Sequence, residues 1–419
     1  MALAPEELVI DQENDFRIHT QIYTEPAIFQ MELERIFERS WVYVAHESEL
    51  PNPGDYITTT IGTQPAIVSR ARDGRIHVML NRCRHRGSVV CRSTRGNTEY
   101  FRCPYHNWTY GDDGALVSIA QASGYEGLDT RALGLLQAET DSYRGLIFAR
   151  LQAGGETLAH RLADVRPYID LWVERSPDGT IQLPRGSHQF DYPANWKFQM
   201  ENGTDGYHGN YVHESFLRVV ERAGQKTVRQ STAQRNTGSV VGLSHGDGFI
   251  DRPSGGMAGQ FDYHDPSLGE YHAQLEAAYG AERTEAILGQ RNLLIYPNLF
   301  LFESHIRVIK PVAVDQTVVV MQPTRLGGAP DDMNRARLRT HERFFGPAGF
   351  GAPDDVEVFV TSQTGMKASA VDWILINRGM HRETVVEGAH IGGHTTDEAP
   401  QRAAYREWKR LMTQPEVAA

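Results

Sequence analysis

NRCRHRGSVVC (81–91) and FRCPYHNWTY (101–110) together hold all three cysteines of this 419-residue chain. Each segment pairs a cysteine with a histidine: Cys83 with His85, and Cys103 with His106. Thiolate and imidazole groups in such pairs are ligands for transition metals. The two segments therefore predict one metal centre that is built from two arms.

The sequence around the two arms alternates apolar and polar residues, which is the period of a β-strand. GDYITTTIGTQPAIVSRARDGRIHVMLNRC (54–83) contains an Asp-Gly hairpin signal at 73–74, and TYGDDGALVSIA (109–120) contains another at 113–114. We therefore expect an all-β domain over residues 39–153, with both arms at the ends of hairpins.

Outside this domain the pattern mixes helices and strands. Helical periodicity runs through residues 27–41, 158–175, 335–345 and 399–412, whereas residues 292–323 alternate as antiparallel strands. The chain is therefore predicted to be α+β. Residues 1–38 and 154–419 are expected to form a second domain, into which the all-β domain is inserted.

Composition excludes several classes of protein. No stretch approaches the roughly 20 apolar residues of a membrane span, and the first residues lack the basic and apolar segments of a targeting peptide. Three cysteines cannot form a disulfide framework, which favours the reducing cytoplasm. A formal net charge of −11 argues against binding to nucleic acids or anionic membranes.

Two kinds of metal centre compete for the four ligands of the arms. A structural zinc site usually pairs cysteine with cysteine and histidine with histidine. A [2Fe–2S] cluster of the Rieske type needs two thiolates on one iron and two imidazoles on the other, so each arm supplies one of each. The mixed arms therefore favour the cluster, with Cys83 and Cys103 on one iron and His85 and His106 on the other.

CRHRG (83–87) and CPYHNW (103–108) resemble the Rieske signature C-x-H-R-G … C-x-x-H-x-W. Cys91 lies outside this signature, and we expect it to be a small buried side chain. Because a Rieske cluster only transfers electrons, a second site in the chain should use them.

NWKFQMENGTDGYHGNYVHESF (195–216) contains the candidate second site. Asp205 and His208 are three residues apart, so on one face of a helix the carboxylate would reach the imidazole. His208 and His213 are five apart, which requires a bend or break in the helix, and glycines stand nearby. Two histidines and one carboxylate hold iron in non-haem Fe(II) oxygenases. Two structural histidines near a helix kink are the alternative.

This segment resembles the catalytic segment of Rieske aromatic ring-hydroxylating dioxygenases, in their large (α) subunit, with the pattern N-W-K … E-N-x-x-D-x-Y-H-x4-H. The resemblance covers nearly the whole chain and points to the benzoate, toluate and anthranilate dioxygenase branch. FFGPAGFGAPDDVEVFVTSQTG (344–365) resembles the family's segment with the third iron ligand, which implies Asp355. Asp354 and Glu357 remain alternatives, because all three acids lie within one helical turn.

The resemblance implies a helix-grip-like catalytic domain, with a central antiparallel sheet surrounded by helices, and an inserted Rieske domain. It implies that O2 and NAD(P)H-derived electrons, passed on by a ferredoxin or a flavin reductase, dihydroxylate an aromatic substrate at mononuclear Fe(II). It also implies a homotrimer of large subunits, either α3 or α3β3 with a small β subunit. Asp205 would join His106 of one subunit to His208 of the next, and Asn202 would be part of the catalytic site.

The substrate is the feature that the sequence determines least. The resemblance to dioxygenases of benzoate and its relatives implies an aromatic carboxylate, and Asn202, Phe345 and Gly351 match pocket positions. Gly351 stands where some relatives carry a bulky aromatic residue, so its small size would widen the pocket. Arg307 and Lys310 are candidates to bind a substrate carboxylate, although two such cations on a strand are more commonly surface or ion-pair residues.

Other functions fit parts of the sequence. A Rieske monooxygenase or demethylase, or a salicylate-type hydroxylase, would carry the same irons. A Rieske electron carrier would need only the all-β domain, and a zinc-binding interaction module would need only the two arms.

Overall fold

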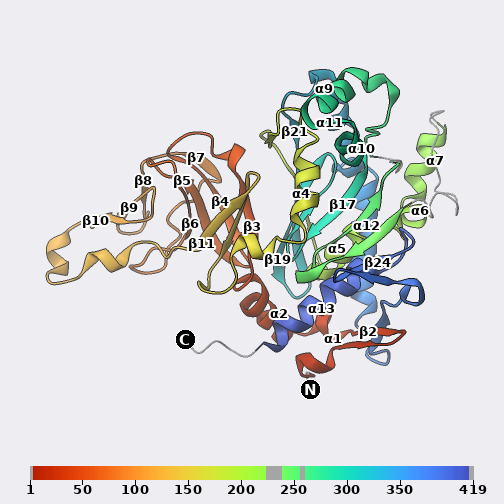
Figure 1. Ribbon diagram of the computed structural model, residues 1–419. Coiled ribbons are helices and arrows are strands. Elements are labelled where there is room, and N and C mark those ends of the chain that lie inside the picture. The colour runs from red at the N-terminus through yellow and green to blue at the C-terminus, as the bar shows by residue number, and fades with distance from the viewer. Residues whose placement is uncertain (1–2, 223–237, 255–259, 415–419) are drawn as a thin grey trace. The chain divides into compact units, whose positions relative to one another are not determined.

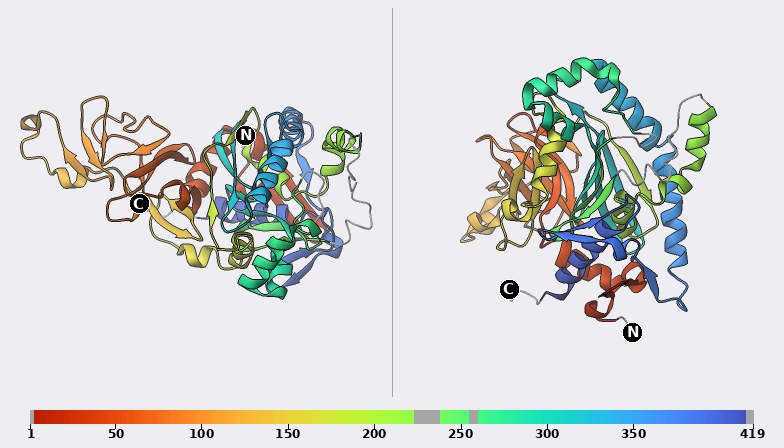
Figure 2. Two further views of the ribbon diagram at one scale, coloured as in Figure 1. Left: turned by 90° about the horizontal axis from the view of Figure 1, so that it is seen from above. Right: turned by 45° about the vertical axis from the view of Figure 1, so that its right-hand side comes forward.

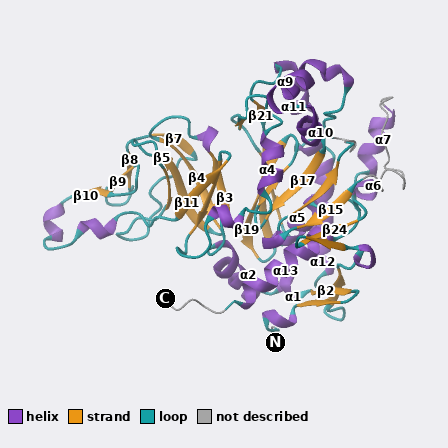
Figure 3. Ribbon diagram, in the orientation of Figure 1, coloured by secondary structure: helices purple, strands orange, loops and turns teal. Residues whose placement is uncertain are grey.

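The computed structural model describes residues 3–222, 238–254 and 260–414. The chain forms two compact units. One unit consists of Met1–Ile36 and Arg161–Ala419, and the other consists of Phe37–His160. Figure 1 labels many of the elements of each unit, and Figure 3 distinguishes their helices, strands and loops.

The unit of residues 37–160 is all-β, as predicted, with only short helical turns between the strands of its described residues (Figure 3). Its strands are β3 (Val42–His46), β4 (Asp55–Ile61), β5 (Gln64–Arg70), β6 (Ile76–Leu80), β7 (Arg95–Asn97), β8 (Tyr100–Arg102), β9 (Thr109–Gly111), β10 (Leu116–Ser118), β11 (Glu139–Tyr143) and β12 (Leu146–Arg150). They form three antiparallel sheets, in the orders β6-β5-β4-β7, β10-β9-β8 and β11-β12-β3.

The two arms leave these strands differently. The second arm joins β8 to β9, which pair with each other as an antiparallel hairpin. The first arm joins β6 to β7, which lie at opposite edges of the four-stranded sheet. The prediction that both arms stand at hairpin ends is therefore right for the second arm and wrong for the first. β7 pairs with β4, an earlier strand, and a local alternation of residues does not encode such a distant partner.

The other unit centres on a nine-stranded antiparallel sheet in the order β14-β20-β19-β18-β17-β16-β15-β24-β23. Its strands are β14 (His188–Tyr192), β15 (Ser239–Gly242), β16 (Gly248–Arg252), β17 (Gln290–Ile295), β18 (Leu299–Leu301), β19 (His305–Ala313), β20 (Gln316–Pro323), β23 (Thr384–Val386) and β24 (Ala389–Gly392). Two small sheets accompany it: β1 (Val9–Gln12) and β22 (Trp373–Leu375) flank β2 (Asp15–His19), and β13 (Ile181–Gln182) pairs with β21 (Arg325–Leu326).

Helices surround this sheet, as predicted (Figures 1 and 2). They are α1 (Gln21–Thr24), α2 (Pro26–Glu32), α4 (Arg166–Val173), α5 (Trp196–Gly203), α6 (Gly209–Val212), α7 (Glu214–Arg222), α9 (Gly269–Tyr279), α10 (Ala281–Leu288), α11 (Asp331–Phe345), α12 (Gly351–Gly365) and α13 (Ala399–Thr413). The helix predicted over 27–41 ends earlier than expected, in a π-helical turn at Leu33–Phe37. The chain returns to this unit within α3 (Leu158–Arg161). In the described ranges, no helix combines the length and the apolar character that a membrane crossing requires.

The pairing register shows which residues share a face of the nine-stranded sheet. One cross-strand row consists of Gly242, Gly248, Leu294, Phe300, Arg307, Met321 and His188. Helices α5 and α13 cover the face of this row, because Gly203 of α5 packs on the ring of Phe300 and Gly242 packs on α13. A Cβ atom at either glycine would overlap its neighbour. On the opposite face, Tyr168 of α4 packs on Phe249, with 4.1 Å between the ring centroids.

Candidate metal centres

Both arms are tight turns with the same backbone plan. In the first arm the N–H of Gly87 donates to the carbonyl of Cys83, and in the second the N–H of Asn107 donates to the carbonyl of Cys103. Gly87 (φ 73°) and Asn107 (φ 57°) both adopt the left-handed conformation, to which glycine and asparagine are best suited. The four-residue spacing from cysteine to this residue is therefore a structural feature that the two arms share.

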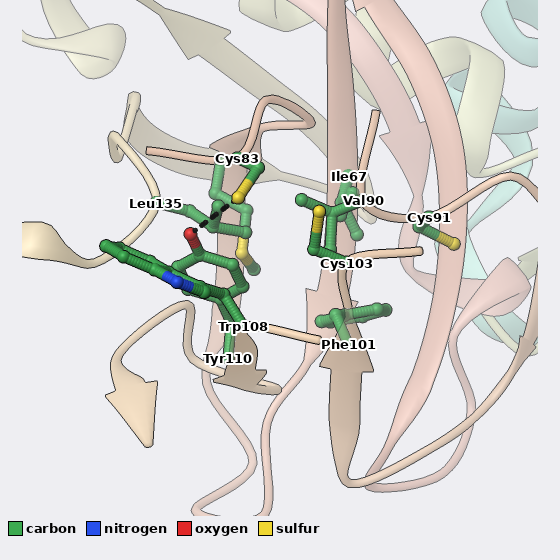
Figure 4. Packing of buried hydrophobic residues seen from close by; sticks show 10 residues of the cluster. Ile67, Cys83, Val90, Cys91, Phe101, Cys103, Trp108, Tyr110 and Leu135 are labelled. Atoms are coloured by element: carbon green, nitrogen blue, oxygen red, sulfur yellow. Dashed lines mark hydrogen bonds between the residues drawn. The ribbon is translucent and has the colours of Figure 1, made fainter. Parts of the chain in front are cut away.

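The turns bring the four predicted ligands together. Cys83 and Cys103 are both buried (Figure 4), and burial raises the pKa of the Cys83 thiol, an effect to which the Cys103 thiol adds. The rings of His85 and His106 lie 4.5 Å apart between centroids. Among the described residues, the buried Nδ1 of His85 has no hydrogen-bond partner. Two thiols beside two imidazoles, one with an open buried nitrogen, fit a [2Fe–2S] cluster.

Aromatic side chains enclose these ligands. Trp108 stacks on His85 at 5.1 Å between centroids, with 5° between the ring planes, and the Tyr125 hydroxyl lies 3.2 Å from Nε2 of His85. Tyr110 accepts a hydrogen bond from a backbone N–H of the first arm. Its own O–H can therefore donate to Sγ of Cys83, which lies 3.3 Å away (Figure 4). These contacts orient the ligands and keep water from the sulfur atoms.

Cys91 does not join the four ligands. It is buried in the same hydrophobic core, but its side chain points away from Cys83 and Cys103 (Figure 4). Its Sγ donates instead to the carbonyl of Ser93 at 3.5 Å. Cys91 thus occupies the small buried position that the sequence predicted for it.

The second set of predicted ligands lies between short helices. Asp205 and His208 occupy the turn between α5 and α6, and His213 separates α6 from α7. The predicted break between the two histidines is therefore confirmed, whereas the prediction that Asp205 and His208 share a helix is wrong. The chain turns here because Gly206 packs against the backbone of Thr395, where a Cβ atom would overlap the carbonyl oxygen.

Three of these groups meet at one point. Oδ1 of Asp355 lies 3.5 Å from Nε2 of His208 and 3.4 Å from Nε2 of His213, and the three ligand atoms all lie within 4.8 Å of one another. Nδ2 of Asn202 lies 3.3 Å from Nε2 of His208 and 3.2 Å from Oδ1 of Asp355. Two imidazole nitrogens and one carboxylate oxygen in this arrangement fit a ferrous ion that keeps open positions.

The two rival acids are placed differently. Asp354 lies on the outer side of His213, 3.7 Å from Nδ1, and accepts a hydrogen bond from Oγ of Ser215 at 3.2 Å. Glu357 is exposed, whereas Asp355 is buried. Because each residue of a helix is rotated by about 100° from the last, α12 presents only one of the three acids to both histidines.

Asp205 contacts the opposite nitrogen of His208. Oδ2 of Asp205 lies 3.1 Å from Nδ1 of His208, and Oδ1 accepts the N–H of Tyr207 at 2.5 Å. Burial acts to lower the pKa of His208, but Asp205 and Asp355 raise it overall. The imidazole therefore has a carboxylate on each side, and Asp205 is placed to fix the orientation of the ring.

Phe345 and Gly351, the other two predicted pocket residues, both lie beside Phe344. The ring of Phe344 is 4.7 Å from that of Phe345 and 5.1 Å from that of His213, between centroids. A Cβ atom at Gly351 would lie 2.5 Å from the Phe344 ring. The space that Gly351 was expected to leave open is therefore occupied by the ring of Phe344.

Sequence reasoning missed two buried histidines near Phe345. His305 lies 4.5 Å and His341 lies 5.8 Å from Phe345 between ring centroids. Position 305 is two residues before Arg307 on a strand, and position 341 is four residues before Phe345 on a helix. Both spacings put side chains on one face, and they are the signal that connects these histidines to the pocket.

Comparison with known proteins gives matches to both units. Residues 40–131 match the Rieske [2Fe-2S] domain family, and residues 182–414 match the catalytic domain of the ring-hydroxylating alpha subunit family. The chain is 34% identical to the large subunit of anthranilate 1,2-dioxygenase from Acinetobacter baylyi, over 95% of this chain and 89% of that one. It is 33% identical to toluate 1,2-dioxygenase subunit alpha from Pseudomonas putida, with the same coverage. A solved structure of naphthalene 1,2-dioxygenase with bound indole is similar at a TM-score of 0.87 and 26% identity, over 98% of this chain and 95% of that one.

Proposed function

This chain belongs to the alpha-subunit family of Rieske ring-hydroxylating dioxygenases, and we propose that it dihydroxylates an aromatic carboxylate. The observation that carries the proposal is the meeting of His208, His213 and Asp355 in a chain that also holds a Rieske domain. The anthranilate and toluate dioxygenases that it resembles are named for aromatic acids, which supports the choice of substrate class.

Family membership settles two of the alternatives. A Rieske electron carrier would have no use for a catalytic domain, yet residues 182–414 match one. A zinc-binding module is contradicted by the match of residues 40–131 to the Rieske [2Fe-2S] domain. The protein is therefore an oxidoreductase of the ring-hydroxylating type.

The proposed reaction adds both atoms of O2 to adjacent ring carbons of the substrate. Two electrons and two protons complete the balance, so that the aromatic acid becomes a cis-dihydrodiol. When bound, the [2Fe–2S] cluster supplies electrons one at a time, and the mononuclear iron activates O2 beside the substrate. The protein supplies ligands, orientation and a pocket that excludes water.

Specific side chains perform these tasks. Asp205 holds Nδ1 of His208, so that Nε2 stays directed at the iron position. The amide of Asn202 lies against both His208 and Asp355 and keeps the carboxylate in place. The ring of Phe344 packs against His213 and against Phe345, and this apolar cover limits the entry of water to the iron position. Four residues would hold the cluster: Cys83, His85, Cys103 and His106.

Assembly and electron supply complete the proposal. A homotrimer of large subunits, with or without a small β subunit, places Asp205 of one copy beside His106 of the next. Electrons then pass through this carboxylate to His208, and they come from NAD(P)H through a ferredoxin or a flavin reductase. Asp205 and His106 are both partly exposed in the single chain, as contact with another copy requires.

Iron content tests the assignment of the second centre. The Asp355→Ala variant should contain about two irons per chain instead of about three, with the visible spectrum of the cluster unchanged. Glu357→Ala, on the same helix but exposed, is the matched control and should keep all the iron. Full iron content in Asp355→Ala would show that the third ligand is another residue.

Oxygen labelling separates dioxygenation from the remaining enzyme alternatives. With 18O2, a dioxygenase puts two labelled atoms into each molecule of product. A Rieske monooxygenase, a demethylase or a salicylate-type hydroxylase puts in one. A panel of benzoate, anthranilate, salicylate and phthalate supplies the substrates, and a single labelled atom in every product would reject dihydroxylation.

A further inference from the structure

Arg307 is a buried cation of β19. It lies on the face of the nine-stranded sheet that α5 covers, the side on which the proposed iron ligands lie. Its side chain is 2% exposed and belongs to the row of β19 that faces α5. The guanidinium carbon lies 4.4 Å from the ring centroid of Phe302 and 5.4 Å from that of Phe345. Two aromatic rings therefore frame the positive charge.

This cation has no counter-ion of its own in the described part of the chain. Burial lowers the pKa of Arg307 to about 10, so the group stays protonated at neutral pH. Nε has no hydrogen-bond partner, and no described carboxylate lies within ion-pair distance. Asp355 is the acid whose charge acts on Arg307, and that carboxylate is already assigned to iron. A buried charge without a partner is costly, and an anionic ligand would supply the missing partner.

The groups around Arg307 are polar but neutral. Burial lowers the pKa of His341 to about 3 and that of His305 well below its usual value, so neither imidazole carries charge at neutral pH. Both nitrogens of His341, Nε2 of His305 and the hydroxyl of Tyr192 are buried without hydrogen-bond partners in the described structure. None of these groups can neutralise a cation, whereas all of them can hydrogen-bond to a polar ligand.

We infer that Arg307 binds the carboxylate of the aromatic substrate and thereby selects acids over neutral aromatic compounds. A guanidinium group forms two parallel hydrogen bonds with a carboxylate, and the rings of Phe302 and Phe345 supply apolar surface for the substrate ring. The inference rests on the proposed function, because it concerns the same pocket.

The strand itself supplies a matched control. Lys310 is three residues after Arg307 on β19, so its side chain points to the opposite face of the sheet. Of the two cations considered from the sequence, the structure therefore places only Arg307 with the iron ligands. Replacement of Lys310 removes the same charge from the same strand without touching the pocket.

Binding measurements on the iron-loaded protein test the inference. Calorimetry compares benzoate and anthranilate with their neutral amides for the wild-type protein and for Arg307→Gln, Arg307→Lys and Lys310→Gln. In Arg307→Gln the Kd of the acids should rise by about 30-fold or more, while the Kd of the amides should stay within about threefold. Arg307→Lys keeps the charge and should recover part of the loss, and Lys310→Gln should match wild type.

Several outcomes would overturn the inference. If Arg307→Gln lost affinity equally for acids and amides, or lost iron, Arg307 would support the structure of the site instead of binding substrate. The inference would also be rejected if the wild-type protein dihydroxylated neutral aromatic compounds but bound no acid. The proposal that the protein dihydroxylates aromatic compounds would then remain valid. If the acids bind through Arg307 but no aromatic compound is oxidised, the proposed function fails and the binding role of Arg307 remains.

Discussion

Replacement of Glu32 by glutamine should destabilise the catalytic unit and disturb the helix that carries Asn202. The Glu32 carboxylate is fully buried and accepts three hydrogen bonds: from Nζ of Lys197 at 2.6 Å, from Nε1 of Trp196 at 2.8 Å and from Nε1 of Trp408 at 2.7 Å. These contacts tie α2 to α5 and α13. Glutamine has nearly the same shape, but it cannot neutralise the Lys197 ammonium, which is also 0% exposed.

The size of the effect follows from that unpaired charge. Removal of one partner from a buried ion pair costs about 3–5 kcal/mol. A unit of about 300 residues unfolds with an entropy of about 0.6 kcal/mol/K. The midpoint temperature of thermal unfolding should therefore fall by about 5–8 °C. Burial lowers the pKa of Lys197 and Glu32 raises it. Without Glu32 the Lys197 amine loses its proton at a lower pH. The difference in unfolding midpoint between Glu32→Gln and wild type should therefore become smaller as the pH rises.

Scanning calorimetry of the iron-loaded protein measures this change. Glu34→Gln removes an exposed acid close to the same helix and should shift the midpoint by less than about 1 °C. The double variant Glu32→Gln/Lys197→Met also removes the unpaired Lys197 ammonium, and it should regain part of the lost thermal stability. A midpoint within about 1 °C of wild type for Glu32→Gln alone would refute the reasoning.

Three further predictions follow from the two metal centres and the unit of residues 37–160. Burial lowers the pKa of His46 from 6.5 to about 4. The unfolded chain therefore binds the proton more tightly than the folded protein does. About 3 kcal/mol of folding stability should be lost as the pH falls from 6.5 to 4. Thermal bleaching of the cluster colour as a function of pH measures this, and a His46→Gln variant with the same pH dependence would contradict it. Tyr110→Phe removes the donor to Sγ of Cys83 and should lower the reduction potential of the cluster by about 20–60 mV; an unchanged potential in a redox titration would count against that hydrogen bond. Asp205→Ala should retain iron and cluster but lose about 10- to 100-fold in turnover, and normal turnover would exclude Asp205 from both the orientation of His208 and the electron path.

Features with short sequence separation were predictable from the sequence. Each arm closes within a few residues, so the spacing of Cys83 and His85, or of Cys103 and His106, already places both ligands of an arm on one turn. The alternation of residues likewise indicates strands, and the all-β unit was expected for that reason. The local pattern failed where a partner is distant. The local pattern assigned Asp205 and His208 to one helix. In the structure both lie in a turn, where Gly206 packs tightly against the backbone of Thr395, a residue far away in the sequence.

The tertiary structure distinguished candidates that the local pattern of residues left open. Residues 354–357 offer three acids within one helical turn, and the resemblance implied Asp355, but the packing of α12 decided that this carboxylate faces the histidines. The sequence offered both Arg307 and Lys310 as candidates to bind a carboxylate, but the register of the sheet places only Arg307 on the face that α5 covers. Periodicity is a property of neighbouring residues, whereas the choice of face depends on free energy gained between segments far apart in the chain.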